Sequence, residues 1–197
     1  MTQQAMPNPV ELFGKASNYA HSVLSGIKQE QIDSSTPCSE WNVKALIDHM
    51  TGGAQYLKMS LEGNPPPPGA AGAAPESPET DVAKLAANYQ SLAAGALQAA
   101  RNPGALEVQV PTPAGEMSGG QFMGIMFMDH LIHTWDLAKA TGQSTRLDPE
   151  LAEICYQMCD PGIIEMAREH GAFGPAVPVP DSASTQNKLL GFLGRQP

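Results

Sequence analysis

Apolar side chains recur every three or four residues along much of this chain, which is the spacing of one face of an α-helix. The pattern predicts helices over residues 9–28, from Asn42 to about residue 61, from about Thr80 to Arg101, and from about Gln121 to Thr141. Amphipathic helices of this length bury their apolar faces against one another. The expected fold class is therefore all-α, an antiparallel four-helix bundle.

Local signals predict where the later helices of the bundle begin and end. Thr80 is the expected N-cap of the third helix, and Gly142 is expected to end the fourth in a left-handed conformation. Between these helices, residues 106–110 alternate apolar and polar side chains and precede a run of turn residues. This segment predicts either a short extended crossover or a hairpin.

The chain continues beyond the four predicted bundle helices. Asp148 and Pro149 are a good N-cap and first-turn pair, so a fifth helix is expected to begin there and to continue past Cys159. A last short helix is expected around residues 187–193. These are the extra C-terminal helices of the predicted bundle.

Residues 65–78 combine four consecutive prolines with small side chains. Proline lacks a backbone donor, and small side chains cannot build a core. We expect an exposed, mobile loop that joins two helices and is dispensable for folding.

Size and charge limit the classes of function. A chain of 197 residues fits one domain, expected to span 1–197, and it can bury a core without disulfides. The net charge of −9 repels polyphosphate and anionic membranes, so neither nucleic acid nor a membrane is an expected partner. The expected oligomeric state is a monomer or a homodimer.

The three cysteines do not form a disulfide framework. Cys38, Cys155 and Cys159 are expected to be reduced thiols that pack as small buried hydrophobic residues. The N-terminal segment has neither the basic start nor the apolar stretch of an export signal, so the expected location is the cytoplasm.

The predicted fourth helix has polar residues on its apolar face. By helical spacing, that face carries Phe122, Ile125, Met126, Asp129, Ile132, His133, Asp136, Leu137 and Ala140. Asp129 and His133 are four residues apart, where a carboxylate oxygen and an imidazole nitrogen can converge on one cation. The spacing also fits a structural pair in which Asp129 accepts a hydrogen bond from His133.

A metal site needs at least one more ligand, and His49 on the predicted second helix is a candidate. His130 shares a different face of the fourth helix with Phe127 and Thr134, so it is not expected at the site. His21 and His170 have no comparable constellation around them and are also left out.

Longer motifs carry a family resemblance. The segments TPCSEWNVKALIDHM, DHLIHTWDLAKATGQ and FGPAVPVPDSASTQNKLLGFLGR resemble the DinB-like superfamily, in the branch typified by the metal-binding domain of mycothiol-dependent maleylpyruvate isomerase. The resemblance spans most of the chain. It implies a divalent metal, usually zinc with nickel as an alternative, bound by His49, Asp129 and His133. Asp136 could orient one of these ligands or make an interhelical hydrogen bond.

The sequence departs from the isomerase pattern at two points. Asp129 stands where the isomerase uses the longer Glu. The isomerase also carries a further C-terminal domain, and little sequence follows Gly171 here. Isomerisation of maleylpyruvate itself is therefore not the expected reaction.

Three protein ligands on a tetrahedral metal leave one position open, as in catalytic zinc sites. The resemblance implies a thiol-dependent transferase or isomerase that uses mycothiol, bacillithiol or a related small thiol on an electrophilic substrate. Two alternatives remain: a hydrolase that uses metal-activated water, and a non-enzymatic stress protein that binds a metal or a small molecule. The individual catalytic residues are unknown.

Overall fold

The computed structural model describes residues 8–39, 41–67, 77–112, 115–169 and 173–197. The chain forms two compact units, Met1–Ser144 and Thr145–Pro197. Each unit is described by itself. The expectation of a single domain over 1–197 stays a prediction.

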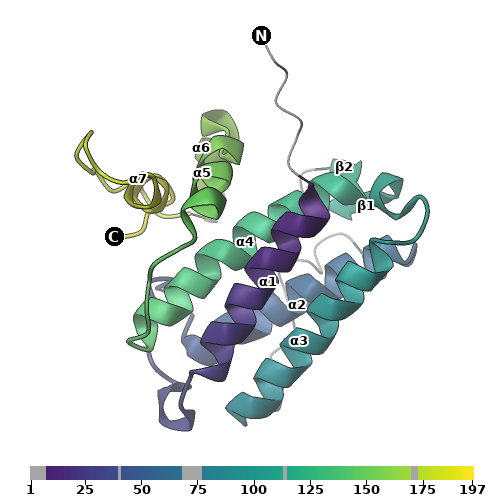
Figure 1. The fold of residues 1–197 in the computed structure, drawn as a ribbon, viewed down its shortest axis with the longest axis horizontal. Coiled ribbons are helices and arrows are strands. Elements are labelled where there is room, and N and C mark those ends of the chain that lie inside the picture. Colours follow the sequence, from purple (N-terminus) through teal and green to yellow (C-terminus); the bar gives the residue numbers. More distant parts are fainter. Residues whose placement is uncertain (1–7, 40, 68–76, 113–114, 170–172) are drawn as a thin grey trace. The chain divides into compact units, whose positions relative to one another are not determined.

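Within the described residues, the first unit contains four long helices, which Figure 1 labels α1 to α4. They are α1 Pro9–Ser25, α2 Val43–Leu61, α3 Val82–Ala99 and α4 Gly119–Ala140. Helix α1 packs against α4 and α3, and α2 packs against the same two helices, so each helix has two neighbours. The four predicted helices and the all-α fold class are confirmed. The core between them is filled by side chains that include Phe13, Leu46, Leu57, Tyr89, Leu131 and Trp135.

Side-chain caps determine where these helices begin. Asn42 Oδ1 accepts a hydrogen bond from the Ala45 amide at 2.9 Å and starts α2. The cap of α3 is Asp81 and not Thr80, because the Asp81 carboxylate accepts the first free amides of the helix. Ser118 is the N-cap of α4, and the helix begins at Gly119, two residues before the predicted Gln121. Ser118 Oγ accepts from the Gln121 amide while the Gln121 side chain accepts from the Ser118 amide.

The segment between α3 and α4 contains a pair of antiparallel strands, so the hairpin alternative was the correct one. Strand β1 Gln109–Thr112 pairs with β2 Gly115–Ser118, and Gln109 lies opposite Ser118. In the parts of the connections that are described, there are also two short 3₁₀ helices, η1 Gln29–Gln31 and η2 Ala105–Glu107. The predicted end of α4 is also confirmed, since Gly142 adopts φ +68°.

The second unit contains α5 Pro149–Met158, α6 Pro161–Glu169 and α7 Thr185–Phe192, of which α5 and α7 pack together. The prediction that the fifth helix continues past Cys159 is wrong. Pro161 disfavours a helical conformation at Asp160 and is itself a favoured first residue of a helix, so α5 ends and α6 begins there.

Most of the predicted 65–78 loop lies outside the described residues, which resume at Ser77. At that point the chain is held to α2. The Ser77 amide donates to Asp48 Oδ2 at 3.2 Å, and Lys44 Nζ donates to the Ser77 carbonyl at 2.7 Å.

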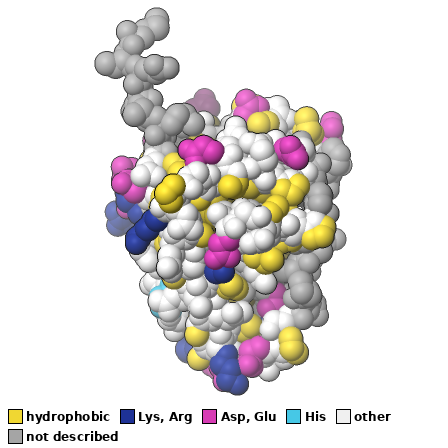
Figure 2. Space-filling view, turned by 90° about the vertical axis from the view of Figure 1, so that its right-hand side faces the viewer, with side chains coloured by type: hydrophobic (Ala, Val, Ile, Leu, Met, Phe, Trp, Pro, Cys, Tyr) yellow, Lys and Arg dark blue, Asp and Glu magenta, His cyan; other side chains and the backbone are white. Residues whose placement is uncertain are grey.

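The surface agrees with the acidic composition. On the face in Figure 2, the Lys and Arg side chains that are drawn in colour are few, and they lie near acidic ones. Within the described ranges, no helix combines the length and apolar character needed to cross a membrane.

Candidate metal centre

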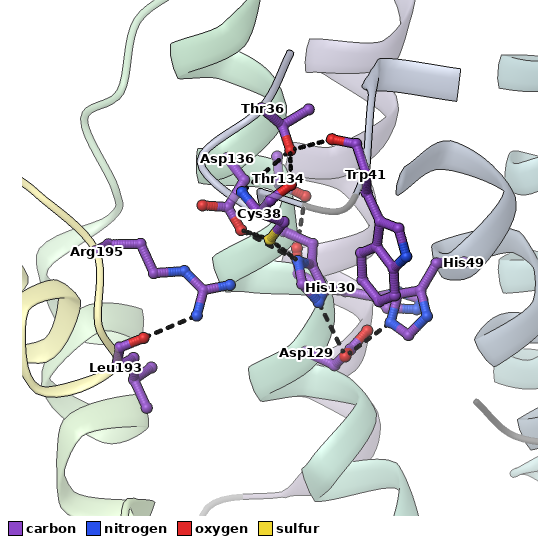
Figure 3. A network of polar contacts seen from close by, with 11 residues as sticks. Thr36, Cys38, Trp41, His49, Asp129, His130, Thr134, Asp136, Leu193 and Arg195 are labelled. Carbon is purple, nitrogen blue, oxygen red and sulfur yellow. Dashed lines mark hydrogen bonds and ion pairs between the residues drawn. The ribbon is translucent and has the colours of Figure 1, made fainter. Parts of the chain in front are cut away.

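Helices α2 and α4 bring the three predicted ligands together. His49 Nε2 lies 3.2 Å from Asp129 Oδ1, and His133 Nε2 lies 3.4 Å from the same oxygen. The rings of His49 and His133 are edge-on to each other, with centroids 5.0 Å apart. Asp129 and His133 are neighbours because they are one helical turn apart, whereas His49 reaches them only because α2 packs against α4. Figure 3 shows His49 and Asp129 facing each other in this cluster.

The donor atoms of these three side chains fit a single small cation. One nitrogen or oxygen from each residue lies within 4.8 Å of the others. Two donors that each sit about 2 Å from a tetrahedral ion are about 3.3 Å apart, close to the distances from Asp129 Oδ1 to His49 Nε2 and to His133 Nε2. The other carboxylate oxygen, Asp129 Oδ2, is buried and has no hydrogen-bond partner in the described structure. A buried carboxylate oxygen without a donor is costly, and a cation would satisfy it.

The charges within the cluster favour a cation. Burial would raise the pKa of Asp129, but the charges of His133 and His49 and their hydrogen bonds outweigh it and hold the pKa well below the usual value. Burial would lower the pKa of His133, but the Asp129 carboxylate, with hydrogen bonds to Asp129 and Asp136, holds the pKa well above the usual value. The carboxylate of Asp129 therefore remains ionised. A metal ion would replace the proton on His133 Nε2, the nitrogen that faces Asp129.

The second nitrogen of His133 has a partner of its own. His133 Nδ1 lies 3.1 Å from Asp136 Oδ2, and Asp136 is fully buried. An Nδ1–H that donates to a carboxylate leaves the Nε2 lone pair free to bind a metal. Of the two roles expected for Asp136, the geometry favours the orienting role.

Sequence reasoning missed two residues beside the predicted ligands. The expectation that Cys38 packs as a buried hydrophobic residue is wrong. Cys38 is half-buried, and its Sγ lies 3.2 Å from Asp136 Oδ2 and 3.8 Å from His133 Nδ1. The Trp41 ring lies over His49, with centroids 4.4 Å apart. Both residues belong to the TPCSEW segment. This segment contributed to the family resemblance, but nothing in it predicted that these two side chains lie beside the ligands. Cys155 and Cys159 are buried, as predicted.

The remaining histidines lie outside this cluster. His130 is fully buried, and its Nδ1 lies 2.9 Å from Tyr89 Oη. Burial lowers the pKa of His130 to about 4, so the ring is neutral near neutral pH. His21 lies on α1, and His170 is outside the described residues. The expectation that Ile125 points into the bundle is wrong, since it is 44% exposed.

Comparison with known proteins identifies relatives over most of the chain. A family model described as the mycothiol maleylpyruvate isomerase N-terminal domain matches residues 13–138. Two proteins of Mycobacterium tuberculosis, from strains CDC 1551 / Oshkosh and ATCC 25618 / H37Rv, are each 33% identical over 189 residues. These alignments cover 95% of this chain and 98% of each relative, and both relatives are described as uncharacterized. No solved structure matches the chain.

Proposed function

Because this chain belongs to the family of mycothiol maleylpyruvate isomerase N-terminal domains, we propose that it is a metal-dependent enzyme that joins a low-molecular-weight thiol to a small electrophilic substrate. The thiol is mycothiol or a related compound such as bacillithiol. The reaction is an S-transfer or a thiol-dependent isomerisation. In an S-transfer a C–S bond forms as the bond to the leaving group breaks, and the thiol proton leaves with that group or passes to solvent. In an isomerisation the thiolate adds to the substrate, the C–S bond breaks again after the substrate has rearranged, and the thiol is regenerated.

In this proposal, His49, Asp129 and His133 hold one divalent cation, with zinc favoured over nickel. Two imidazole nitrogens and one carboxylate are a common zinc ligand set, and three protein ligands leave a position for a substrate. When bound, such a cation supplies Lewis acidity that favours the thiolate form of a thiol near neutral pH. The observation that carries the proposal is the buried, unpartnered Oδ2 of Asp129, a carboxylate whose other oxygen contacts both histidines.

The surrounding side chains of the protein prepare this site. Asp136 holds the proton on His133 Nδ1, which fixes the tautomer that presents Nε2 to Asp129. The Trp41 ring covers His49 and lies 5.7 Å from the His133 ring, so it limits the approach of water to both imidazoles.

Metal content and turnover should be lost together in ligand variants. His49→Ala and His133→Ala each leave two of the three ligands, so both variants should lose bound zinc and turnover of a thiol-reactive electrophile. Zinc is measured by elemental analysis of the purified protein, and turnover is measured with several cellular thiols. His21→Ala is the matched control. Among the described residues, two clusters of side chains could hold a cation, His49–Asp129–His133 and Cys38–His133–Asp136, and His21 belongs to neither.

The comparison between metal-loaded and metal-stripped wild-type protein decides the function class. Equal rates in the two preparations would remove the metal from the reaction, and no turnover in either would favour a metal-binding or small-molecule-binding protein. Turnover that persists without added thiol would favour a hydrolase that uses activated water.

A further inference from the structure

The thiol of Cys38 shares an acceptor with a proposed metal ligand. Cys38 Sγ donates to Asp136 Oδ2 at 3.2 Å, and His133 Nδ1 lies 3.1 Å from the same oxygen. Asp136 is fully buried on α4, whereas Cys38 lies on the connection before α2. One carboxylate oxygen therefore links a thiol on one segment to an imidazole on another.

The connection before α2 is ordered by its own hydrogen bonds. Thr36 Oγ1 accepts from the Cys38 amide at 3.1 Å and lies 2.7 Å from the Trp41 carbonyl oxygen. Ser35 and Asn42 form an antiparallel bridge that closes the segment at its base. These contacts place Cys38 against Asp136 and Trp41 over His49 (Figure 3). The loop thus contacts both of the helices that carry the proposed ligands.

We infer that Cys38 is a positioning residue, whose thiol holds the Asp136 carboxylate in the orientation that keeps His133 Nε2 directed at the metal site. This inference rests on the proposed function. A carboxylate can rotate about its terminal bond, and each donor that it accepts restricts that rotation. Removal of the thiol therefore loosens Asp136, and through Asp136 it loosens the His133 ring.

The role of Cys38 differs from that of a metal ligand or a nucleophile. A hydrogen-bond donor can be replaced by another donor of similar size, so the hydroxyl of serine should preserve the effect. Alanine cannot donate and should not preserve it. A comparison of Cys, Ser and Ala at position 38 therefore shows whether the hydrogen bond to Asp136 matters or only the volume of the side chain.

The test measures zinc affinity and the state of His133 in the full-length protein. Cys38→Ala should bind zinc about tenfold more weakly than wild type, the lower end of the effect of losing an outer partner of a ligand. Cys38→Ser should bind zinc close to wild type. Affinity is measured by competition with a chromophoric chelator. The His133 Nδ1–H signal of the zinc-loaded, ¹⁵N-labelled protein should persist in wild type and Cys38→Ser and exchange faster with solvent in Cys38→Ala.

Two further variants sharpen the test. Cys155→Ala removes a buried thiol from the second unit and should leave zinc affinity unchanged. Thr36→Val keeps the side-chain shape but removes the hydroxyl that orders the loop, so it should weaken zinc binding in wild type and have little further effect in Cys38→Ala. Circular dichroism of each variant checks that the fold is retained.

The possible results separate this inference from the proposed function. Absence of zinc binding by wild type would overturn both. Normal zinc affinity and His133 signals in Cys38→Ala would overturn the inference alone, as would a Cys38→Ser variant as weak as Cys38→Ala. A sulfur-to-cobalt charge-transfer band in the cobalt-loaded wild type that is absent from Cys38→Ser would make Cys38 a ligand and also overturn it.

Discussion

Asp129 is half-buried, and it combines a negative charge with a buried oxygen that has no partner in the described structure. Its Oδ1 contacts both His49 and His133, while Oδ2 has no partner in the described structure. The two histidines hold the Asp129 pKa well below the usual value, so the side chain is present as the carboxylate. The charge of this group, more than its shape, should therefore determine how tightly a cation binds.

This argument predicts different outcomes for two conservative substitutions. Asp129→Asn keeps the shape but removes the charge, and zinc affinity should fall on the order of a hundredfold or more, at least as much as for loss of an outer-shell partner. Asp129→Glu keeps the charge and should retain zinc. Chelator competition measures both affinities, with Asp181→Asn, an exposed carboxylate in the second unit, as the control. Equal zinc affinity in Asp129→Asn and wild type would exclude Asp129 as a ligand.

At the scale of elements, the start of α4 determines where Asp129 and His133 lie along the bundle. Gly119 begins this helix, and a Cβ there would lie 2.5 Å from the Ala105 carbonyl oxygen and 2.9 Å from Leu61 Cδ2. A Cβ on Gly120 would meet its nearest neighbour, the Leu106 carbonyl oxygen, only at 3.6 Å. The two adjacent glycines thus differ in the space around them.

Gly119→Ala and Gly120→Ala should therefore have different effects on stability. Gly119→Ala must displace the backbone of η2, and the free energy of unfolding should fall by about 1–3 kcal/mol. Gly120→Ala meets only ordinary contacts, and a helical alanine should leave the free energy unchanged or raise it by up to about 1 kcal/mol. Urea denaturation followed by circular dichroism measures both. A similar loss in the two variants would show that the close approach of α4 to η2 has no special role.

At the scale of the whole molecule, the 65–78 segment tests how far the bundle depends on its longest connection. Residues 70–72 lie outside the described ranges. Their removal changes the entropic free energy of loop closure by less than about 0.6 kcal/mol. The thermal midpoint should then move by no more than about 2 °C in a chain of this size. Differential scanning calorimetry measures the shift.

Asp48→Ala provides the contrasting variant. It removes the buried carboxylate that accepts from both Ser77 and Lys44, so it should lower the thermal midpoint by more than the deletion does. A deletion that destabilises the protein as much as Asp48→Ala would show that the segment itself packs.

The expected cytoplasmic location, the monomeric or homodimeric state and the absence of nucleic-acid partners remain predictions.

The sequence by itself determined the helices and the pairing of Asp129 with His133. Both follow from local rules, because the apolar periodicity and the four-residue spacing depend only on neighbours along the chain. His49 was selected with the help of a family motif, since nothing local distinguishes a ligand from a structural histidine. Helix boundaries were predicted to within a few residues, and the errors at Asp81, Ser118 and Pro161 came from side-chain caps and proline geometry.

Only the tertiary structure decided which other groups surround the site. Cys38 and Trp41 lie on an irregular connection, where no periodicity predicts the direction of a side chain, and their contacts with Asp136 and His49 join residues far apart in sequence. Helix α4 is packed on several sides, so a single apolar stripe could not predict that His130 would be buried and Ile125 exposed. Long-range packing, and not local propensity, determines these positions.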